Sequence, residues 1–143
     1  MPSIDWNKPA AYDAAAKAAF HSAARRQLRK LADELGFTPG TYDLRANKAG
    51  IAVSGEITLH HDRVYVQVSQ PVTGGRDGIL IRTCEGRSDY SGGPNHFAAL
   101  DALDDIPGLA RRVRGIMPEF RTEELLDSQT DEERDEYYRR LSM

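Results

Sequence analysis

The chain has 143 residues, of which 40% are hydrophobic and 29% are charged, and its formal net charge is −3. This length fits one domain, residues 1–143, with a hydrophobic core of its own. The net negative charge disfavours broad electrostatic binding to a nucleic-acid polymer or to an acidic membrane surface.

Cysteine content and segment hydropathy narrow the class of protein further. Cys84 is the only cysteine, so the sequence predicts no internal disulfide and no cysteine-rich zinc site. The first residues, MPSIDWNKPAAYD, lack the basic and then apolar stretches of a secretory signal peptide. No run approaches the ~20 apolar residues that span a bilayer. We therefore expect a cytoplasmic protein without a membrane segment.

The first predicted element is a long helix. Apolar residues recur at spacings of three and four from Tyr12 to Leu35, which is the period of one helix face. Asn7 and Pro9 mark the expected start of this helix, and Gly36 marks its end.

Alternating apolar and polar residues then predict strands. Residues 42–46, 51–59 and 64–68 follow this pattern, and the apolar run ILIRTC at 79–84 is typical of a further strand. The connections between these segments are short. They indicate an antiparallel meander of about four strands.

The rest of the chain is predicted to be helical. Apolar residues from Phe97 to Leu103 have helical spacing, and Pro107 fits the first turn of a following helix. Thr130 and Glu133 form a capping box before a last helix. A helix, about four strands and then two to three helices make an α+β fold.

The segment RTCEGRSDYSGGPNHF, residues 82–97, is the richest in ligand-binding residue types. Its glycines precede a predicted helix, whose free backbone N–H groups favour an anion that approaches closely. Arg82 and Arg87 offer guanidinium groups to a phosphate, and Asn95 either caps the helix or contacts a base or ribose. Alternatively the segment is only a turn and a cap, with Arg87 and Asp89 paired at the surface.

Neighbouring residues extend this candidate site. Tyr90 and Phe97 are alternative stacking partners for a base, and Asp89 can accept from ribose hydroxyls. Arg112 can reach a second phosphate, although basic residues near a helix C-terminus are also stabilising in themselves. The candidate ligand-binding residues are Arg82, Arg87, Asp89, Tyr90, Ser91, Gly92, Gly93, Asn95, Phe97 and Arg112.

Catalytic and metal-binding patterns are sparse. Cys84, His96 and Asp89 are the residue types of a nucleophile, a base and an orienting acid. However, Cys84 ends an apolar strand, where a cysteine is typically a small buried hydrophobic residue. His60 and His61 are adjacent in a strand and point to opposite faces, which makes them poor ligands for one metal ion. We expect no enzymatic activity, no catalytic residues, no metal and no cofactor.

The chain length, the order of elements and the segment GRSDYSGGPN resemble the phage Thoeris anti-defence sponge family. The resemblance rests on residues 78–114. It implies a phage or prophage protein that forms homo-oligomers and sequesters a glycocyclic ADP-ribose signal without cleaving it. Some members also hold cyclic di- or trinucleotides in separate pockets. The nucleotide contacts that the resemblance implies fall on Arg87, Gly92, Gly93, Asn95 and Arg112.

The expected function is therefore non-enzymatic sequestration of a phosphate-bearing cyclic nucleotide signal, in pockets shared between protomers. The alanine-rich first helix and the tyrosine-bearing C-terminal segment are candidate oligomer surfaces. Two alternatives stay open. One is a small enzyme that processes such a nucleotide through His96 or Asp89. The other is a protein-binding inhibitor of a host defence nuclease.

Overall fold

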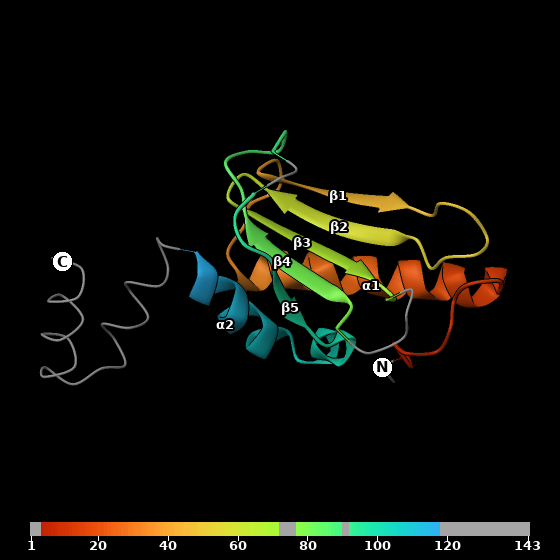
Figure 1. The fold of residues 1–143 in the computed structure, drawn as a ribbon. Helices are drawn as coiled ribbons and strands as arrows, with labels where there is room; N and C mark the ends of the chain where they lie inside the picture. The colour runs from red at the N-terminus through yellow and green to blue at the C-terminus, as the bar shows by residue number, and fades with distance from the viewer. Residues whose placement is uncertain (1–3, 72–76, 90–91, 118–143) are drawn as a thin grey trace, which may run out of the picture.

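A computed structural model describes residues 4–71, 77–89 and 92–117. Five antiparallel strands form one sheet in the order β1-β2-β3-β4-β5, and the helices α1 and α2 pack against it (Figure 1). The expected α+β class, with a helix before an antiparallel meander, is confirmed. The strands are β1 (Tyr42–Asn47), β2 (Glu56–His61), β3 (Val64–Ser69), β4 (Ile79–Thr83) and β5 (His96–Ala98).

The first helix, α1 (Ala14–Glu34), starts later than the sequence pattern predicts. The Asp13 carboxylate accepts a hydrogen bond from the Ala16 N–H at 3.0 Å and so caps the helix. The expected start at Asn7 and Pro9 is therefore wrong. The expected end is confirmed, because Gly36 follows with a φ of 77°, the left-handed conformation that often terminates helices.

The alternation along the strands separates two faces of the sheet. One face packs against the helices and carries the apolar residues Ile57, Leu59, Val64, Val66, Val68, Ile79, Ile81 and Ala98. On the helices, Phe20, Leu28 and Leu31 of α1 belong to the same core. The opposite side, the polar face, carries Asp43, Arg45, Thr58, His60, Tyr65, Gln67, Arg82 and Phe97.

The second strand is shorter than predicted. Residues 48–55 connect β1 to β2, and Ile51, an expected strand residue, has 76% of its surface exposed. The β1–β2 pairing starts at Glu56, directly after Gly55, where the two chain segments approach closely. The φ of Gly55 is 73°, and a Cβ there would lie 2.5 Å from the Asn47 carbonyl oxygen. The chain passes too close to β1 at this point for any other residue type.

The segment after SGGPN is a strand rather than the expected helix. Residues 96–98 form β5, in which Ala98 lies opposite Ile79 of β4. A short 3₁₀ helix, η1 (Leu100–Asp104), then places Leu100 and Leu103 in the core. Pairing with the edge of β4 satisfies backbone groups that a helix would have satisfied internally. Asn95 therefore caps no helix.

The last described helix, α2 (Ile106–Ile116), matches the sequence prediction. Pro107 lies in its first turn, and the Asp105 carboxylate accepts a hydrogen bond from the Gly108 N–H at 3.1 Å. Leu109 and Val113 pack into the core beside α1. The further helix predicted after Thr130 lies outside the described residues.

Candidate ligand site at the end of the sheet

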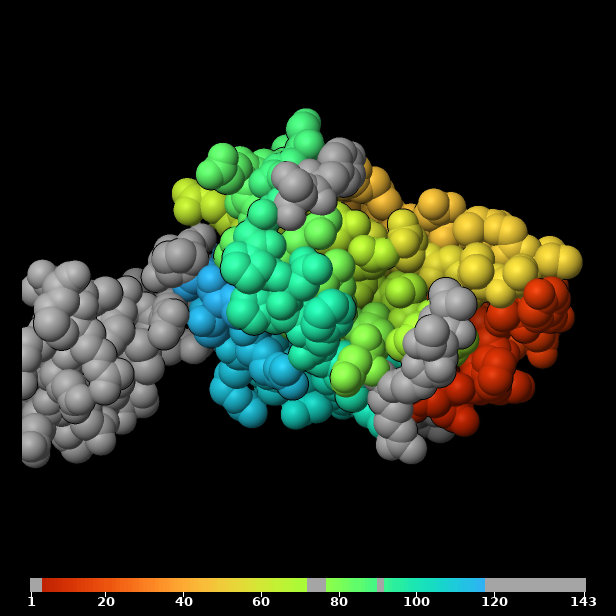
Figure 2. Space-filling view, in the orientation of Figure 1, coloured from red at the N-terminus to blue at the C-terminus, as the bar shows by residue number. Residues whose placement is uncertain are grey.

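The candidate site surrounds the β4–β5 loop, whose described residues are 84–89 and 92–95. This loop lies beside the β2–β3 turn, since the Cys84 N–H donates to the Arg63 carbonyl oxygen at 2.9 Å. Residues 85–89, in green, project from the body of the protein at the top of Figure 2. The loop is thus held at one end of the sheet while its far side faces solvent.

Asp89 organises the backbone of this loop. One carboxylate oxygen accepts from the Glu85 N–H and the other from the Gly92 N–H, both at 3.0 Å. The Asp89 N–H in turn donates to the Gly86 carbonyl oxygen at 3.1 Å. The structure thus assigns Asp89 to loop closure, and its expected contact with a ribose stays a prediction.

The two glycines pack closely against the end of β4. Gly92 has a φ of 54°, and a Cβ there would lie 2.4 Å from the Thr83 carbonyl oxygen. A Cβ on Gly93 would lie 2.5 Å from the Thr83 hydroxyl oxygen, and the Gly93 N–H donates to the Thr83 carbonyl oxygen at 2.9 Å. This close approach explains the glycines without a bound anion. The expected helix N-terminus beside them is absent, because β5 follows.

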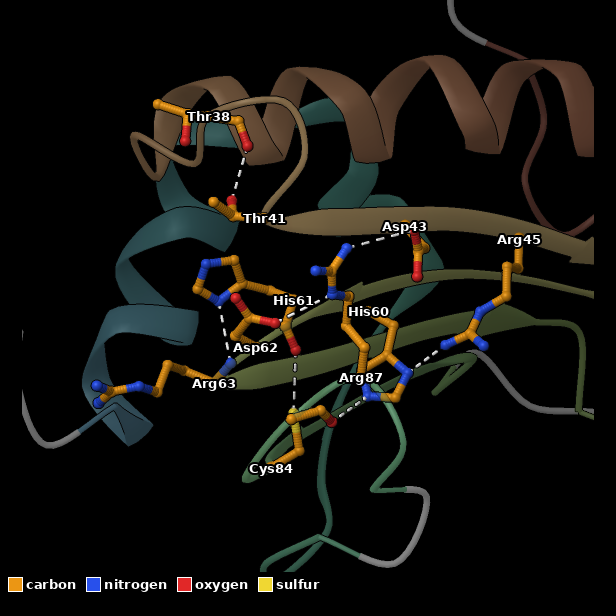
Figure 3. A network of polar contacts seen from close by, with 11 residues as sticks. Thr38, Thr41, Asp43, Arg45, His60, His61, Asp62, Arg63, Cys84 and Arg87 are labelled. Carbon is orange, nitrogen blue, oxygen red and sulfur yellow. Dashed lines mark hydrogen bonds and ion pairs between the residues drawn. The ribbon is translucent and has the colours of Figure 1, made fainter.

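Arg87 connects the loop to two other parts of the sheet. Its Nε donates to Asp62 Oδ1 at 3.1 Å, and its guanidinium lies 3.7 Å from Asp43 Oδ1 (Figure 3). All three side chains are partly exposed, so each ion pair contributes roughly 0–1 kcal/mol. Arg87 therefore positions the loop weakly and can exchange partners at small cost.

His60 supports the loop from the polar face of the sheet. It is fully buried, and its Nε2–H donates to the Gly86 carbonyl oxygen at 3.0 Å. Its Nδ1 accepts from the Arg45 guanidinium, which assigns the ring proton to Nε2 (Figure 3). Burial, and then the charge of Arg45, lower the pKa of His60. The neutral ring thus connects Arg45 to the Gly86 carbonyl oxygen through its two nitrogens. The sequence analysis did not predict this role.

Tyr65 and Arg82 lie beside His60 on the polar face, on the next two strands of the sheet. Tyr65 lies opposite both His60 and Arg82 in the strand register. Its ring meets that of His60 edge-on at a centroid distance of 5.0 Å, and the Arg82 guanidinium carbon lies 4.4 Å from its centroid. Such a cation–π contact contributes about 0.5–2 kcal/mol, depending on its exposure. The alternation of side chains along β3 predicts that Tyr65 lies on the polar face. Its neighbours His60 and Arg82 follow only from the strand register.

A cavity of about 740 Å³ lies against the loop. This volume falls within the range of small-molecule sites, roughly 300–1,000 Å³. Its described lining has one guanidinium, from Arg87, and two carboxylates, from Glu85 and Asp89. The lining residues are Thr83, Cys84, Glu85, Gly86, Arg87, Ser88, Asp89, Gly92 and Gly93.

Among the remaining predicted site residues that the structure describes, none lines this cavity: Arg82, Asn95, Phe97 and Arg112. Phe97 lies on β5 with 53% of its surface exposed, and Asn95 is also exposed. Arg112 donates from its guanidinium to the Phe97 carbonyl oxygen at 2.8 Å, so it covers the edge of β5. Tyr90 and Ser91 lie outside the described residues.

Cys84 has the environment of a structural thiol. It is buried, and its Sγ donates to the His61 carbonyl oxygen at 3.2 Å. Burial raises the pKa of the thiol, which disfavours the nucleophilic thiolate. His61 itself stacks on Phe37 with ring centroids 3.7 Å apart. The two adjacent histidines therefore serve separate packing roles.

Within residues 4–71, 77–89 and 92–117, no group of three or more His, Cys, Asp or Glu side chains is arranged to hold a metal ion. No helix in these ranges has both the length and the apolar character needed to cross a membrane. Comparisons of the chain with protein-family models, with curated proteins and with solved structures found no match.

Proposed function

We propose that this protein binds a small cyclic nucleotide in the cavity against the β4–β5 loop and holds it without chemical conversion. The cavity of about 740 Å³, lined by polar backbone and side chains, is the observation that carries the proposal. The nucleotide class and the anti-defence role in a host cytoplasm come from the family resemblance of residues 78–114. The cavity supports a site of the required size at the expected segment.

The lining favours a ligand with several hydroxyl groups and few phosphates. Arg87 can transfer its hydrogen bonds from Asp43 and Asp62 to a phosphate, because those ion pairs are partly exposed and weak. Glu85 and Asp89 would repel a dense polyphosphate while accepting from hydroxyl donors. A cyclic ADP-ribose isomer or a cyclic dinucleotide fits this balance better than a nucleoside triphosphate.

The titratable groups near the cavity support binding rather than conversion. Both ring nitrogens of His60 are engaged, one by Arg45 and one by Gly86. The thiol of Cys84 has a raised pKa and is therefore a weak nucleophile. A protein that hides a signal needs tight, complementary contacts but no general base or nucleophile.

A thermal-shift screen against ADP-ribose isomers, cyclic di- and trinucleotides and NAD tests this function. Ligand from each positive sample is released by heat and identified by chromatography. We expect a stabilising ligand that is recovered intact. A ligand that is recovered as a product would establish an enzyme instead. No response to any compound would refute nucleotide binding and leave the protein-binding alternative.

Arg87→Ala tests the site itself. We expect affinity for the ligand found in the screen to fall about tenfold or more, because a charge-assisted hydrogen bond to the ligand is lost. Arg111→Ala is the matched control, since Arg111 is an exposed arginine of α2 that does not line the cavity. Equal affinity in the two variants would place the ligand elsewhere on the protein.

A further inference from the structure

The outer edge of β1 is not paired with another strand of the described sheet. β1 is the terminal strand of the sheet and runs along its upper rim in Figure 1. The Arg25 guanidinium donates to the Leu44 carbonyl oxygen at 3.3 Å, from the side away from β2. In an antiparallel strand the N–H and C=O of one residue point the same way. Tyr42, Leu44 and Ala46 therefore direct their backbone groups outward.

The two edges of the sheet differ in length, although an arginine donates to a carbonyl oxygen at each. β5 has three residues, and Arg112 donates to its Phe97 carbonyl oxygen as Arg25 does to that of Leu44 in β1. β1 pairs with β2 over six consecutive positions, and its sequence, YDLRAN, contains no proline. A regular strand of this length is a template for another strand.

The charges on β1 are complementary to those of a second copy of the same strand. If two β1 strands pair antiparallel with Leu44 opposite Leu44, Asp43 of each copy lies opposite Arg45 of the other. Both side chains lie on the polar face, where cross-strand pairs of opposite charge are stabilising. The arrangement is two-fold symmetric, as expected for a homodimer.

Other registers that use the same outward backbone groups are unfavourable. If one β1 strand shifts by two residues along the other, the pairing is centred on residue 43 or on residue 45. Asp43 then lies opposite Asp43 in the first case, and Arg45 lies opposite Arg45 in the second. Like charges directly opposite each other are destabilising. The sequence DLR thus selects one register among the neighbouring ones.

Asp43 is accessible to a second partner. Its carboxylate lies 3.7 Å from Arg87, and its side chain is about half exposed. Asp43 can therefore contact Arg45 of another copy and keep its contact within its own chain.

The flank of α1 beside this edge carries small side chains. Arg25 reaches β1, and Ala18 and Ser22 lie seven and three positions earlier, on the same side of the helix. Both are exposed. Small residues at these two positions leave room beside the β1 edge. Arg25 lies on the edge itself, where the Leu44 carbonyl oxygen, with two lone pairs, can accept from both Arg25 and a second copy.

We infer that the protein forms a two-fold homodimer by antiparallel pairing of β1 strands, with Leu44 opposite Leu44 and Asp43 opposite Arg45. The two sheets then form one continuous sheet of ten strands. This inference goes beyond the proposed nucleotide binding and does not depend on it. None of the paired residues lines the cavity against the β4–β5 loop.

Charge reversal tests this dimer on the full-length chain. Molar mass is measured by light scattering at micromolar concentrations for the wild type, Asp43→Arg and Arg45→Asp. We expect a wild-type dimer and two monomeric variants, because each variant places like charges at both pairs. Arg111→Asp, which reverses a charge on α2, should leave the dimer intact.

Mixing the two variants separates an interface effect from misfolding. A one-to-one mixture of Asp43→Arg and Arg45→Asp should form a heterodimer, because both opposite-charge pairs are restored between unlike copies. The double variant with both changes should also dimerise with itself. A misfolded variant would not recover on mixing.

Leu44→Pro supplies an independent test of the backbone pairing. It removes an N–H that points away from β2, so the β1–β2 ladder is retained while dimerisation falls at least tenfold. Circular dichroism checks that the variant is folded. A monomeric wild type, or a wild-type dimer that none of these substitutions weakens, would overturn the proposal.

Discussion

Arg45 and His60 together determine the protonation of a buried imidazole. The Arg45 guanidinium donates to Nδ1, so the ring proton resides on Nε2 and is donated to the Gly86 carbonyl oxygen. Through this pair the first two strands of the sheet hold the base of the β4–β5 loop. The neutral state of His60 is therefore coupled to the conformation of the candidate site.

This coupling predicts that stability falls in mild acid. The pKa of His60 is lowered from 6.5 by burial and by Arg45, whose effects exceed the opposing ones of Gly86, Asp43 and Asp89. As pH falls below 6.5, the unfolded chain binds a proton that the folded protein excludes, so the free energy of unfolding decreases. Melting temperatures between pH 5 and 8 measure the effect. His60→Gln should flatten this dependence, whereas His96→Gln at an exposed position should not.

Gly92→Ala should destabilise the protein by about 1–3 kcal/mol. The new Cβ would lie 2.4 Å from the Thr83 carbonyl oxygen, and the backbone φ of 54° is unfavourable for alanine. Gly86→Ala is the matched control in the same loop, because a Cβ at Gly86 meets no atom within 4 Å. Urea unfolding of both variants measures the difference. Equal stabilities would contradict the close packing of the loop against β4.

Cys84 should react slowly with iodoacetamide in the folded protein. The side chain is buried, its Sγ donates to His61, and its pKa is raised by burial. The reactive thiolate is therefore scarce at neutral pH. Mass spectrometry of native and urea-unfolded samples measures the labelling rates. Rapid labelling of the native protein would instead indicate an activated thiol and favour the enzyme alternative.

Asp104→Ala should weaken the attachment of the N-terminal segment. The buried Trp6 ring donates from Nε1 to Asp104 Oδ1 at 2.9 Å, a contact between residues far apart in the chain. Loss of the acceptor should cost about 1–3 kcal/mol of unfolding free energy, because a buried donor is left without its partner. Asp33→Ala, at an exposed position of α1, is the control. Trp6→Phe in the Asp104→Ala background should recover part of the loss.

Several features of the fold could be predicted from local sequence alone. Gly36 ends α1 because a glycine readily adopts a positive φ, and Pro107 fits the start of α2 because its ring matches the helical φ. The alternation at residues 64–68 reflects a strand with one face in the core. These signals depend on a few neighbouring residues, so they can be recognised without knowledge of the tertiary structure.

The candidate site shows why the remainder could not be predicted. The apolar spacing from Phe97 to Leu103 fits a helix as well as a strand followed by a 3₁₀ turn, and pairing with β4 selects the latter. The partners of Arg87 come from β1 and from the β2–β3 turn, which are distant in sequence. Likewise, nothing local to His60 indicates that Gly86 accepts from it.

The sequence by itself determined the α+β class, the end of α1, the start of α2 and the location of a polar, glycine-rich segment. Local conformational preferences and hydrophobic periodicity are sufficient for these features. Only the tertiary structure decided that the glycines pack against Thr83 and that β1 is a terminal strand of the sheet. These outcomes depend on strand order and register, which arise from contacts between residues far apart in the chain.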